Sequence, residues 1–259
     1  MIFGIPLLAF LFQLIYDPYF PIDSLNKLIA LECNNSAILN PDEYFPEGST
    51  ILQPAWREIQ AEAIHVMETY ELPDLAEVEP IQQVIYRNGS WDVFMLIVLN
   101  EPVPENQALM PRTTELLKQC KGVRNAMLSI LKPGVQILPH EGILKSVVRY
   151  MLALVTPEPD DVYLNLYHPY GTYHWREGEQ FMFDDLYVHE VIHRGKQDRV
   201  LLFLDIDRTH LSLWGRVADG IIMGLAKMLP IYSGIHEKAK PPLKVPLPEP
   251  VEAGGAVLN

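Results

Sequence analysis

The sequence is poor in cysteine and in basic residues, and both deficits restrict what the chain can be. Only Cys33 and Cys120 occur in 259 residues, too few for a disulfide framework and too far apart for a metal-binding pair; they are free thiols or one bridge. Acidic residues outnumber basic ones by 33 to 20, giving a formal net charge of −13. This charge argues against nucleic acid or an anionic membrane as a general partner, so no nucleic-acid partner is expected.

The sequence also lacks a long hydrophobic run and an internal repeat. Residues 1–16 are apolar and uncharged, but a spanning helix needs roughly 20 residues. The segment contains Pro6 and has no basic flank of the kind that precedes a signal peptide. We expect it to pack on the core or to touch a membrane peripherally.

Composition and pattern divide the chain into three parts. Residues 1–50 form an apolar and then irregular, proline-punctuated segment that packs on the core, and residues 209–259 form an amphipathic helix and a proline-rich tail. Residues 51–208 lie between them as the main domain. It opens with a helix over 54–70, where apolar residues recur at helical spacing.

Three further elements flank the main sheet. Two strand-like runs over 84–99 are separated by Asn88-Gly89, a dipeptide typical of a hairpin. Residues 111–120 predict a short helix. Residues 211–229 predict an amphipathic helix with a broad apolar face, which packs on the core, a second subunit or a membrane, with Gly220 and Gly224 available for close helix contact.

The centre of the sequence consists of short runs rich in β-branched and aromatic residues, separated by turn sequences such as Lys132-Pro133-Gly134. The eight runs are 123–131, 135–140, 147–156, 162–167, 172–175, 180–185, 187–193 and 199–207. About eight short strands at this spacing predict a mainly β protein with flanking α-helices. Its core, about 123–208, would be a cupin-like jelly-roll, the double-stranded β-helix.

Strand alternation then decides which side chains meet. His189 shares a strand face with Val191, and Arg149 shares one with Met151. If these faces point inward, His140, His189, Arg149 and Arg199 converge in the barrel mouth, a common place for a small-molecule site.

A competing motif occupies the same stretch. His189-Glu190-Val191-Ile192-His193 fits the His-Glu-x-x-His pattern of zinc metalloproteases. That pattern requires a helix, whereas in a strand the two histidines would stand about 13 Å apart. The surrounding composition favours a strand.

Several spaced motifs, taken in order, make the sequence similar to a known family. They are His140-Glu141-Gly142, Arg149, Trp175-Arg176-Glu177-Gly178-Glu179, Phe183-Asp184-Asp185, His189-Glu190-Val191, Arg199 and Asp205-Ile206. Together they resemble the aspartyl/asparaginyl β-hydroxylases, Fe(II)- and 2-oxoglutarate-dependent dioxygenases that include the bacterial lipid A hydroxylases. The resemblance covers roughly residues 86–208.

The resemblance implies that His140 and His189 are the iron ligands. Open Fe(II) sites are commonly built from two histidines and one carboxylate, yet the carboxylate position two residues after His140 is Gly142. The β-hydroxylases also lack this carboxylate. Asp184 and Asp185 either form a turn or orient a ligand histidine.

The resemblance also implies a 2-oxoglutarate site. Arg199 and Ser129 would hold the distal carboxylate, Arg149 the opposite end, and Trp91 would line the pocket. The family usually has a histidine where this chain has Met151, which cannot donate a hydrogen bond to a carboxylate. The alternative interpretations are ordinary ion pairs for the two arginines, a backbone bond for Ser129 and a core position for Met151.

The expected function is therefore Fe(II)- and 2-oxoglutarate-dependent oxidation of an unactivated C–H bond in a peptide residue, a lipid or a small metabolite. The alternative is a redox-inactive member of the same fold that acts as a binding module, isomerase or cyclase. The sequence leaves the oligomeric state open, and the compartment open between cytoplasm, membrane surface and endoplasmic reticulum.

Overall fold

The computed structural model describes residues 20–241 except 34, 159, 209–210 and 229–233. The apolar segment 1–16 and the proline-rich tail beyond residue 241 lie outside the described residues, so their expected roles stay predictions.

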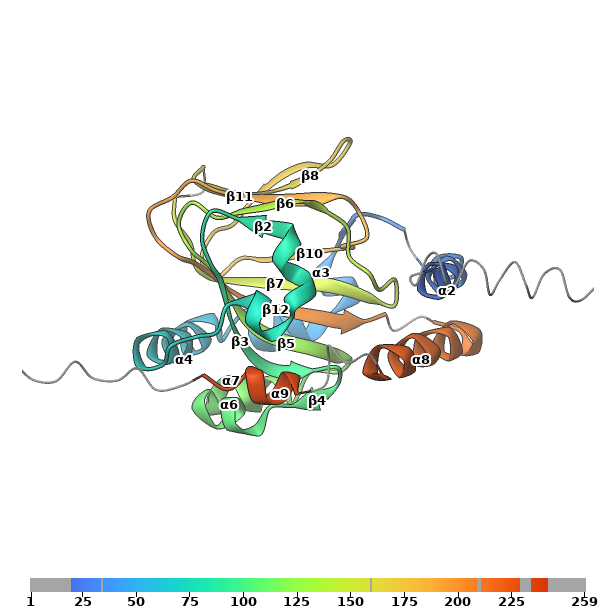
Figure 1. Cartoon of the computed structure of the whole chain (residues 1–259), viewed down its shortest axis with the longest axis horizontal. Coiled ribbons are helices and arrows are strands. Elements are labelled where there is room, and N and C mark those ends of the chain that lie inside the picture. The colour runs from blue at the N-terminus through green and yellow to red at the C-terminus, as the bar shows by residue number, and fades with distance from the viewer. Residues whose placement is uncertain (1–19, 34, 159, 209–210, 229–233, 242–259) are drawn as a thin grey trace, which may run out of the picture.

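Two antiparallel sheets face each other and form the body of the molecule (Figure 1). The first has the strand order β1-β10-β7-β12-β5-β3-β4 and the second β2-β6-β11-β8-β9. The strands are β1 Ile38–Leu39, β2 Tyr86–Arg87, β3 Trp91–Val98, β4 Glu101–Pro102, β5 Val123–Leu131, β6 Gln136–His140, β7 Val147–Val155, β8 Val162–Leu166, β9 Gly171–His174, β10 Gln180–Phe183, β11 His189–His193 and β12 Arg199–Asp207.

The eight predicted strands are β5 to β12, and they are shared equally between the sheets. β5, β7, β10 and β12 lie side by side in one sheet, and β6, β8, β9 and β11 lie side by side in the other. This interleaving confirms the double-stranded β-helix, mainly β with flanking helices.

Alternating side chains divide the core into two layers. Leu201 and Phe203 of β12 point between the sheets, while Leu202 and Leu204 pack on the opposite face of the larger sheet. That opposite face is covered by α4 (Trp56–Thr69), whose apolar side enters the same cluster. Because both faces of the larger sheet are buried, its central strands are almost continuously apolar.

The remaining helices lie around the two sheets. They are α2 Phe20–Ala30, α3 Pro41–Tyr44, α5 Leu75–Val78, α6 Pro104–Leu109, α7 Pro111–Leu117, α8 Leu213–Met228 and α9 Ile235–Lys238, with a π-helical turn at Gly48–Leu52 and a 3₁₀ helix at Pro80–Ile85. In the described part of the chain, no helix combines the length and apolar character needed to cross a bilayer.

Three expectations about the flanking segments are wrong. The stretch expected to be irregular contains α2, which packs on α8 through Ile29. Asn88 and Gly89 do form a turn at positive φ, but β2 pairs with β6 and β3 with β5, so the turn carries the chain between sheets and closes no hairpin. A Cβ at Gly220 or Gly224 would meet nothing within 4 Å, so neither glycine serves a close helix contact among the described residues.

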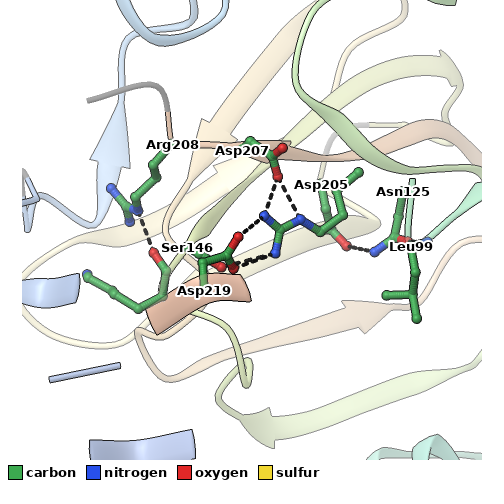
Figure 2. Close-up of polar contacts among 9 residues, drawn as sticks. Leu99, Asn125, Ser146, Asp205, Asp207, Arg208 and Asp219 are labelled. Atoms are coloured by element: carbon green, nitrogen blue, oxygen red, sulfur yellow. Dashed lines mark hydrogen bonds and ion pairs between the residues drawn. The ribbon is translucent and has the colours of Figure 1, made fainter. Parts of the chain in front are cut away.

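A buried arginine fastens α8 to the larger sheet. The guanidinium of Arg124 in β5 is 3% exposed and pairs with Asp207 of β12 at 2.6 Å and Asp219 of α8 at 2.8 Å (Figure 2). It also donates to the hydroxyl of Ser146 at 3.1 Å. Each of the three guanidinium nitrogens therefore donates to a partner.

Candidate active site

Two histidines face each other on neighbouring strands. β6 and β11 are adjacent and antiparallel, and their register sets His140 directly opposite His189. The ring centroids are 4.2 Å apart. The structure thus brings together the two residues that the resemblance implies as metal ligands.

Both imidazoles are held in the same tautomer. The Nδ1 atoms lie 2.8 Å from the carbonyl oxygens of Leu138 and Tyr187, respectively. A carbonyl only accepts, so each Nδ1 carries the hydrogen and each Nε2 keeps a lone pair, as a metal ligand requires. Burial lowers the pKa of His140, and burial together with the neighbouring ring lowers that of His189 to about 3. Both rings are therefore neutral near pH 7.

Position 142 is blocked by a carboxylate from another part of the chain. A Cβ added at Gly142 would overlap the carboxylate of Asp185. Asp185 bonds Arg149 at 3.0 Å, its Oδ1 has no hydrogen-bond partner, and burial raises its pKa to about 6. In the described part of the chain, no third histidine, cysteine, aspartate or glutamate joins the histidine pair to form a metal-binding group.

Arg199 carries a buried charge with no carboxylate beside it among the described residues. Its side chain is 2% exposed, its Nη2 donates to the Ser129 hydroxyl at 3.0 Å, and its Nε has no partner. The guanidinium lies 5.0 Å from the centre of the Trp175 ring. Burial lowers its pKa to about 9. An unpaired buried cation is costly, so this position is suited to receive an anion.

The hydroxyl of Ser129 lies beside Arg199 and has a hydrogen available for a ligand. Its oxygen accepts from Trp91 Nε1 at 2.9 Å and from Arg199, so it does not make the backbone bond of the alternative interpretation. A hydroxyl has two acceptor sites and one hydrogen. With both acceptor sites used, the hydrogen remains for a ligand oxygen.

Arg149 differs from Arg199 because carboxylates already surround it. It bonds Asp185 at 3.0 Å and Asp205 at 3.1 Å, and it lies over the Phe203 ring. The ion-pair interpretation thus describes Arg149, although its side chain still faces the cavity.

The cavity is small and mostly apolar. Its volume is about 20 Å³, room for about one water, so a larger ligand requires side chains to shift. The lining residues are Trp91, Ile137, His140, Arg149, Met151, Leu164, Trp175, Phe183, His189, Val191, Arg199 and Phe203. Met151 lines it as a buried core residue, and its unbranched chain readily changes conformation.

The zinc-protease interpretation is wrong. His189 and His193 lie on the strand β11, not on a helix, so they stand about 13 Å apart. His189 lines the cavity, whereas His193 Nδ1 accepts from the Gly195 backbone at 3.1 Å.

Some residues near the site could not be assigned from the sequence. Asp184 does make the expected turn, in which its Oδ1 accepts from the Leu186 backbone at 3.2 Å. It is also fully buried in ion pairs with Lys145 and Arg208, which the sequence did not indicate. Trp175 supplies the ring beside Arg199. Glu79 lies close enough to Arg149 for the two charges to interact, and burial raises the pKa of its carboxyl group. It lies between α5 and the 3₁₀ helix, so the strand pattern that indicated the other site residues could not indicate it.

The fold and the site define a jelly-roll protein with a histidine pair and a buried arginine lining one cavity. The sequence comparisons identify the family. The family model described as "Aspartyl/Asparaginyl beta-hydroxylase" matches residues 53–209. The chain belongs to this family, and it is accordingly an oxidoreductase of the hydroxylase type.

Two relatives illustrate the relationship. The "Ornithine lipid ester-linked acyl 2-hydroxylase" of Rhizobium tropici is 30% identical over 196 residues, which cover 74% of this chain and 69% of that protein. The human "Aspartate beta-hydroxylase domain-containing protein 2" is 32% identical over 128 residues, covering 46% of this chain but only 34% of its own. The alignment therefore spans about a third of the human protein.

Solved structures also align with this chain, at low sequence identity. The epimerase SnoN from nogalamycin biosynthesis, described as non-heme and α-ketoglutarate dependent, aligns with a TM-score of 0.44 and 13% identity over 71% of this chain and 82% of its own.

Proposed function

We propose that the protein is an Fe(II)- and 2-oxoglutarate-dependent dioxygenase that hydroxylates an unactivated C–H bond. One observation carries the proposal: two neutral histidines face each other in the cavity that Arg199 also lines, and Arg199 is a buried cation without a carboxylate partner among the described residues. A metal ion and a carboxylate ligand are the groups that this pairing fits.

The residues fit the cofactor set in their donor chemistry. His140 and His189 would hold iron through Nε2, the atoms that the backbone bonds at Nδ1 leave available. Iron with 2-oxoglutarate and O₂ supplies an oxidant that converts C–H to C–OH while releasing succinate and CO₂. The mostly apolar lining of the cavity would keep bulk water away from the histidines, which strengthens electrostatic interactions inside the cavity.

The 2-oxoglutarate would lie between the histidines and Arg199. The Arg199 guanidinium and the Ser129 hydroxyl would bind its distal carboxylate by charge-assisted hydrogen bonds, with Trp91 fixing the serine. Arg149 faces the cavity nearer the histidine end, but Asp185 and Asp205 already balance its charge. Arg149 would therefore contribute less to affinity than Arg199.

A lipid acyl chain is the substrate class that the comparisons favour over a peptide residue or a small metabolite. The support is the printed name of the Rhizobium tropici relative, an ester-linked acyl 2-hydroxylase of ornithine lipid that aligns along most of both chains.

The test is succinate formation that depends on both iron and substrate. Purified protein loaded with Fe(II) should bind 2-oxoglutarate by calorimetry and release succinate with lipid extracts in detergent. His189→Ala should abolish succinate release, whereas His193→Gln, on the same strand but outside the cavity lining, should retain it. If 2-oxoglutarate neither binds nor yields succinate across lipid, peptide and metabolite panels, the oxygenase proposal fails in favour of the binding module, isomerase or cyclase.

A further inference from the structure

The helix α8 exposes a continuous apolar stripe. Trp214 is 77% exposed and Met228 is 81% exposed. The stripe consists of Leu213, Trp214, Val217, Ile221, Leu225 and Met228. At about 100° per residue these six positions fall within an arc of about 120°, so they form one side of the helix.

This stripe is separate from the side that α8 uses for packing. Ala218 and Ile222 are buried against Ile29 of α2, and Asp219, the one acidic residue of α8, is bound to Arg124. The exposed arc therefore contains no acidic residue. On the helical wheel, Arg216 and Lys227 lie next to the stripe, on the side away from Ala218 and Ile222. Lys227 forms an ion pair with Glu101. A large apolar face with basic residues beside it is typical of helices that lie in a membrane interface.

The start of α8 is joined to the end of α2. The carboxylate of Glu32, two residues after α2, accepts from the Ser212 backbone at 2.9 Å and from its hydroxyl at 2.6 Å. Leu28 in the last turn of α2 and Leu31, the first residue after α2, are also exposed, Leu31 by 84%. The exposed leucines of α2 and the stripe of α8 thus belong to one pair of connected helices, which lie at the same end of the molecule (Figure 1). We call these eight residues the α2–α8 face.

The sequence before α2 indicates what covers this face. Residues 1–16, apolar and uncharged, lead into α2 across only three residues. The most apolar run of the chain therefore joins the helix pair that carries the exposed apolar side chains. A bilayer surface could bury both this apolar run and the exposed apolar side chains of the two helices.

We propose that the α2–α8 face docks on the surface of a phospholipid bilayer, with its apolar side chains inserted at the headgroup–acyl boundary. This deepens the proposed function and rests on it only in assuming a lipid substrate. The net charge of −13 makes a zwitterionic surface the fitting one, and insertion of apolar side chains should make binding insensitive to salt.

The docking helices adjoin the segment that carries a proposed iron ligand. Asn26 of α2 donates to the Ile143 carbonyl at 2.7 Å and accepts from the Lys145 backbone at 2.9 Å, within the loop that follows His140. A cleft of about 390 Å³ lies between α2 and this loop, with Glu141 in its wall. Docking would therefore present this side of the catalytic domain to the membrane.

The experiment is sedimentation of the full chain with phosphatidylcholine vesicles. Ile221→Ser should weaken binding roughly tenfold, as expected when one buried aliphatic side chain is lost, and Trp214→Ser by at least as much. The matched control is Ile64→Ser on α4, which removes a similarly exposed isoleucine elsewhere. Vesicles with brominated acyl chains should quench the fluorescence of Trp214, and Trp214→Phe should remove that quenching. Of the other three tryptophans, Trp91 and Trp175 are buried, and Trp56 is partly buried on α4 against the larger sheet.

Four outcomes would overturn the docking proposal. The first is that the protein does not bind vesicles, and the second is that Ile221→Ser and Ile64→Ser weaken binding equally. The third is that the double variant Leu8→Ser, Phe10→Ser binds more tightly, which would mean that residues 1–16 cover the α2–α8 face themselves. The fourth is that the protein forms a dimer that Ile221→Ser dissociates, and that it binds no vesicles. Succinate release from detergent-dispersed lipid should be the same in Ile221→Ser and wild type. That assay separates failure of docking from failure of the oxygenase proposal.

Discussion

Replacing Arg199 by methionine should stabilise the ligand-free protein while destroying its affinity for 2-oxoglutarate. Arg199 is 2% exposed, and its Nε has no hydrogen-bond partner. Methionine keeps much of the aliphatic volume and adapts to an irregular site, so the substitution removes a charge without opening a large cavity.

The magnitude follows from the cost of burying that charge. Burial lowers the pKa of Arg199 from 12.5 to about 9, which corresponds to about 5 kcal/mol against the charged form at about 1.4 kcal/mol per pKa unit. Relaxation reduces the realised gain, and replacement of buried ion pairs by apolar residues of similar volume is often neutral or stabilising by about 1–4 kcal/mol. We expect Arg199→Met to fall within that range. For a domain of this size, each kcal/mol raises the melting temperature by roughly 2–4 °C.

The control is Arg124→Met, because Arg124 is equally buried but bonds Asp207, Asp219 and Ser146. Removing it leaves carboxylates without their partner and should cost about 3–5 kcal/mol. Thermal unfolding followed by fluorescence compares the two variants, with and without 2-oxoglutarate, which should stabilise only proteins that retain Arg199. If Arg199→Met lowers the melting temperature as far as Arg124→Met does, Arg199 is a satisfied structural residue and the anion site is refuted.

Three further changes should have measurable effects. Ser129→Ala removes the hydroxyl that Trp91 and Arg199 position and should weaken 2-oxoglutarate binding roughly tenfold by calorimetry; an unchanged affinity would contradict this role. Met151→His places a hydrogen-bond donor in the cavity and should tighten the same binding by a similar factor, unless the ring cannot reach the ligand, in which case affinity will not rise. The pKa of His189 is lowered from 6.5 to about 3 in the folded protein. Between these pH values the unfolded chain binds more protons than the folded one, so the free energy of unfolding falls as the pH drops below about 6.5. The urea midpoints at pH 7 and pH 4.5 should therefore differ less in His189→Gln than in the wild type, and an equal difference would contradict a neutral buried ring.

The jelly-roll could be predicted because its signals are local. Alternating apolar residues and Gly/Pro turns define each strand by itself, and β5 and β12 begin and end where the sequence pattern does. The helix α2 was missed although Ile22, Leu25 and Ile29 have helical spacing, because prolines around it suggested a loop. Its partner, α8, lies almost two hundred residues away in the chain.

Pairings between distant segments set the limit of the sequence analysis. Asn88-Gly89 has the composition of a hairpin turn, and only the positions of β5 and β6 decide that the strands on either side join different sheets. The same holds in the site. Alternation within strands placed His189, Arg149 and Arg199 on inward faces, and all three line one cavity. The bonds of Arg149 to two aspartates depend on the register between β7, β10 and β12.

The contact between Gly142 and Asp185 restricts how this centre could acquire a third protein ligand. Gly142→Asp alone would force its new side chain into the Asp185 carboxylate, and Asp185→Gly alone would remove one of the counter-charges of Arg149. Only the combination of Gly142→Asp with Asp185→Gly moves a carboxylate from one segment to the other without a steric clash. Engineering, or evolution, toward a two-histidine, one-carboxylate centre therefore has to pass through an impaired single variant or change both positions together.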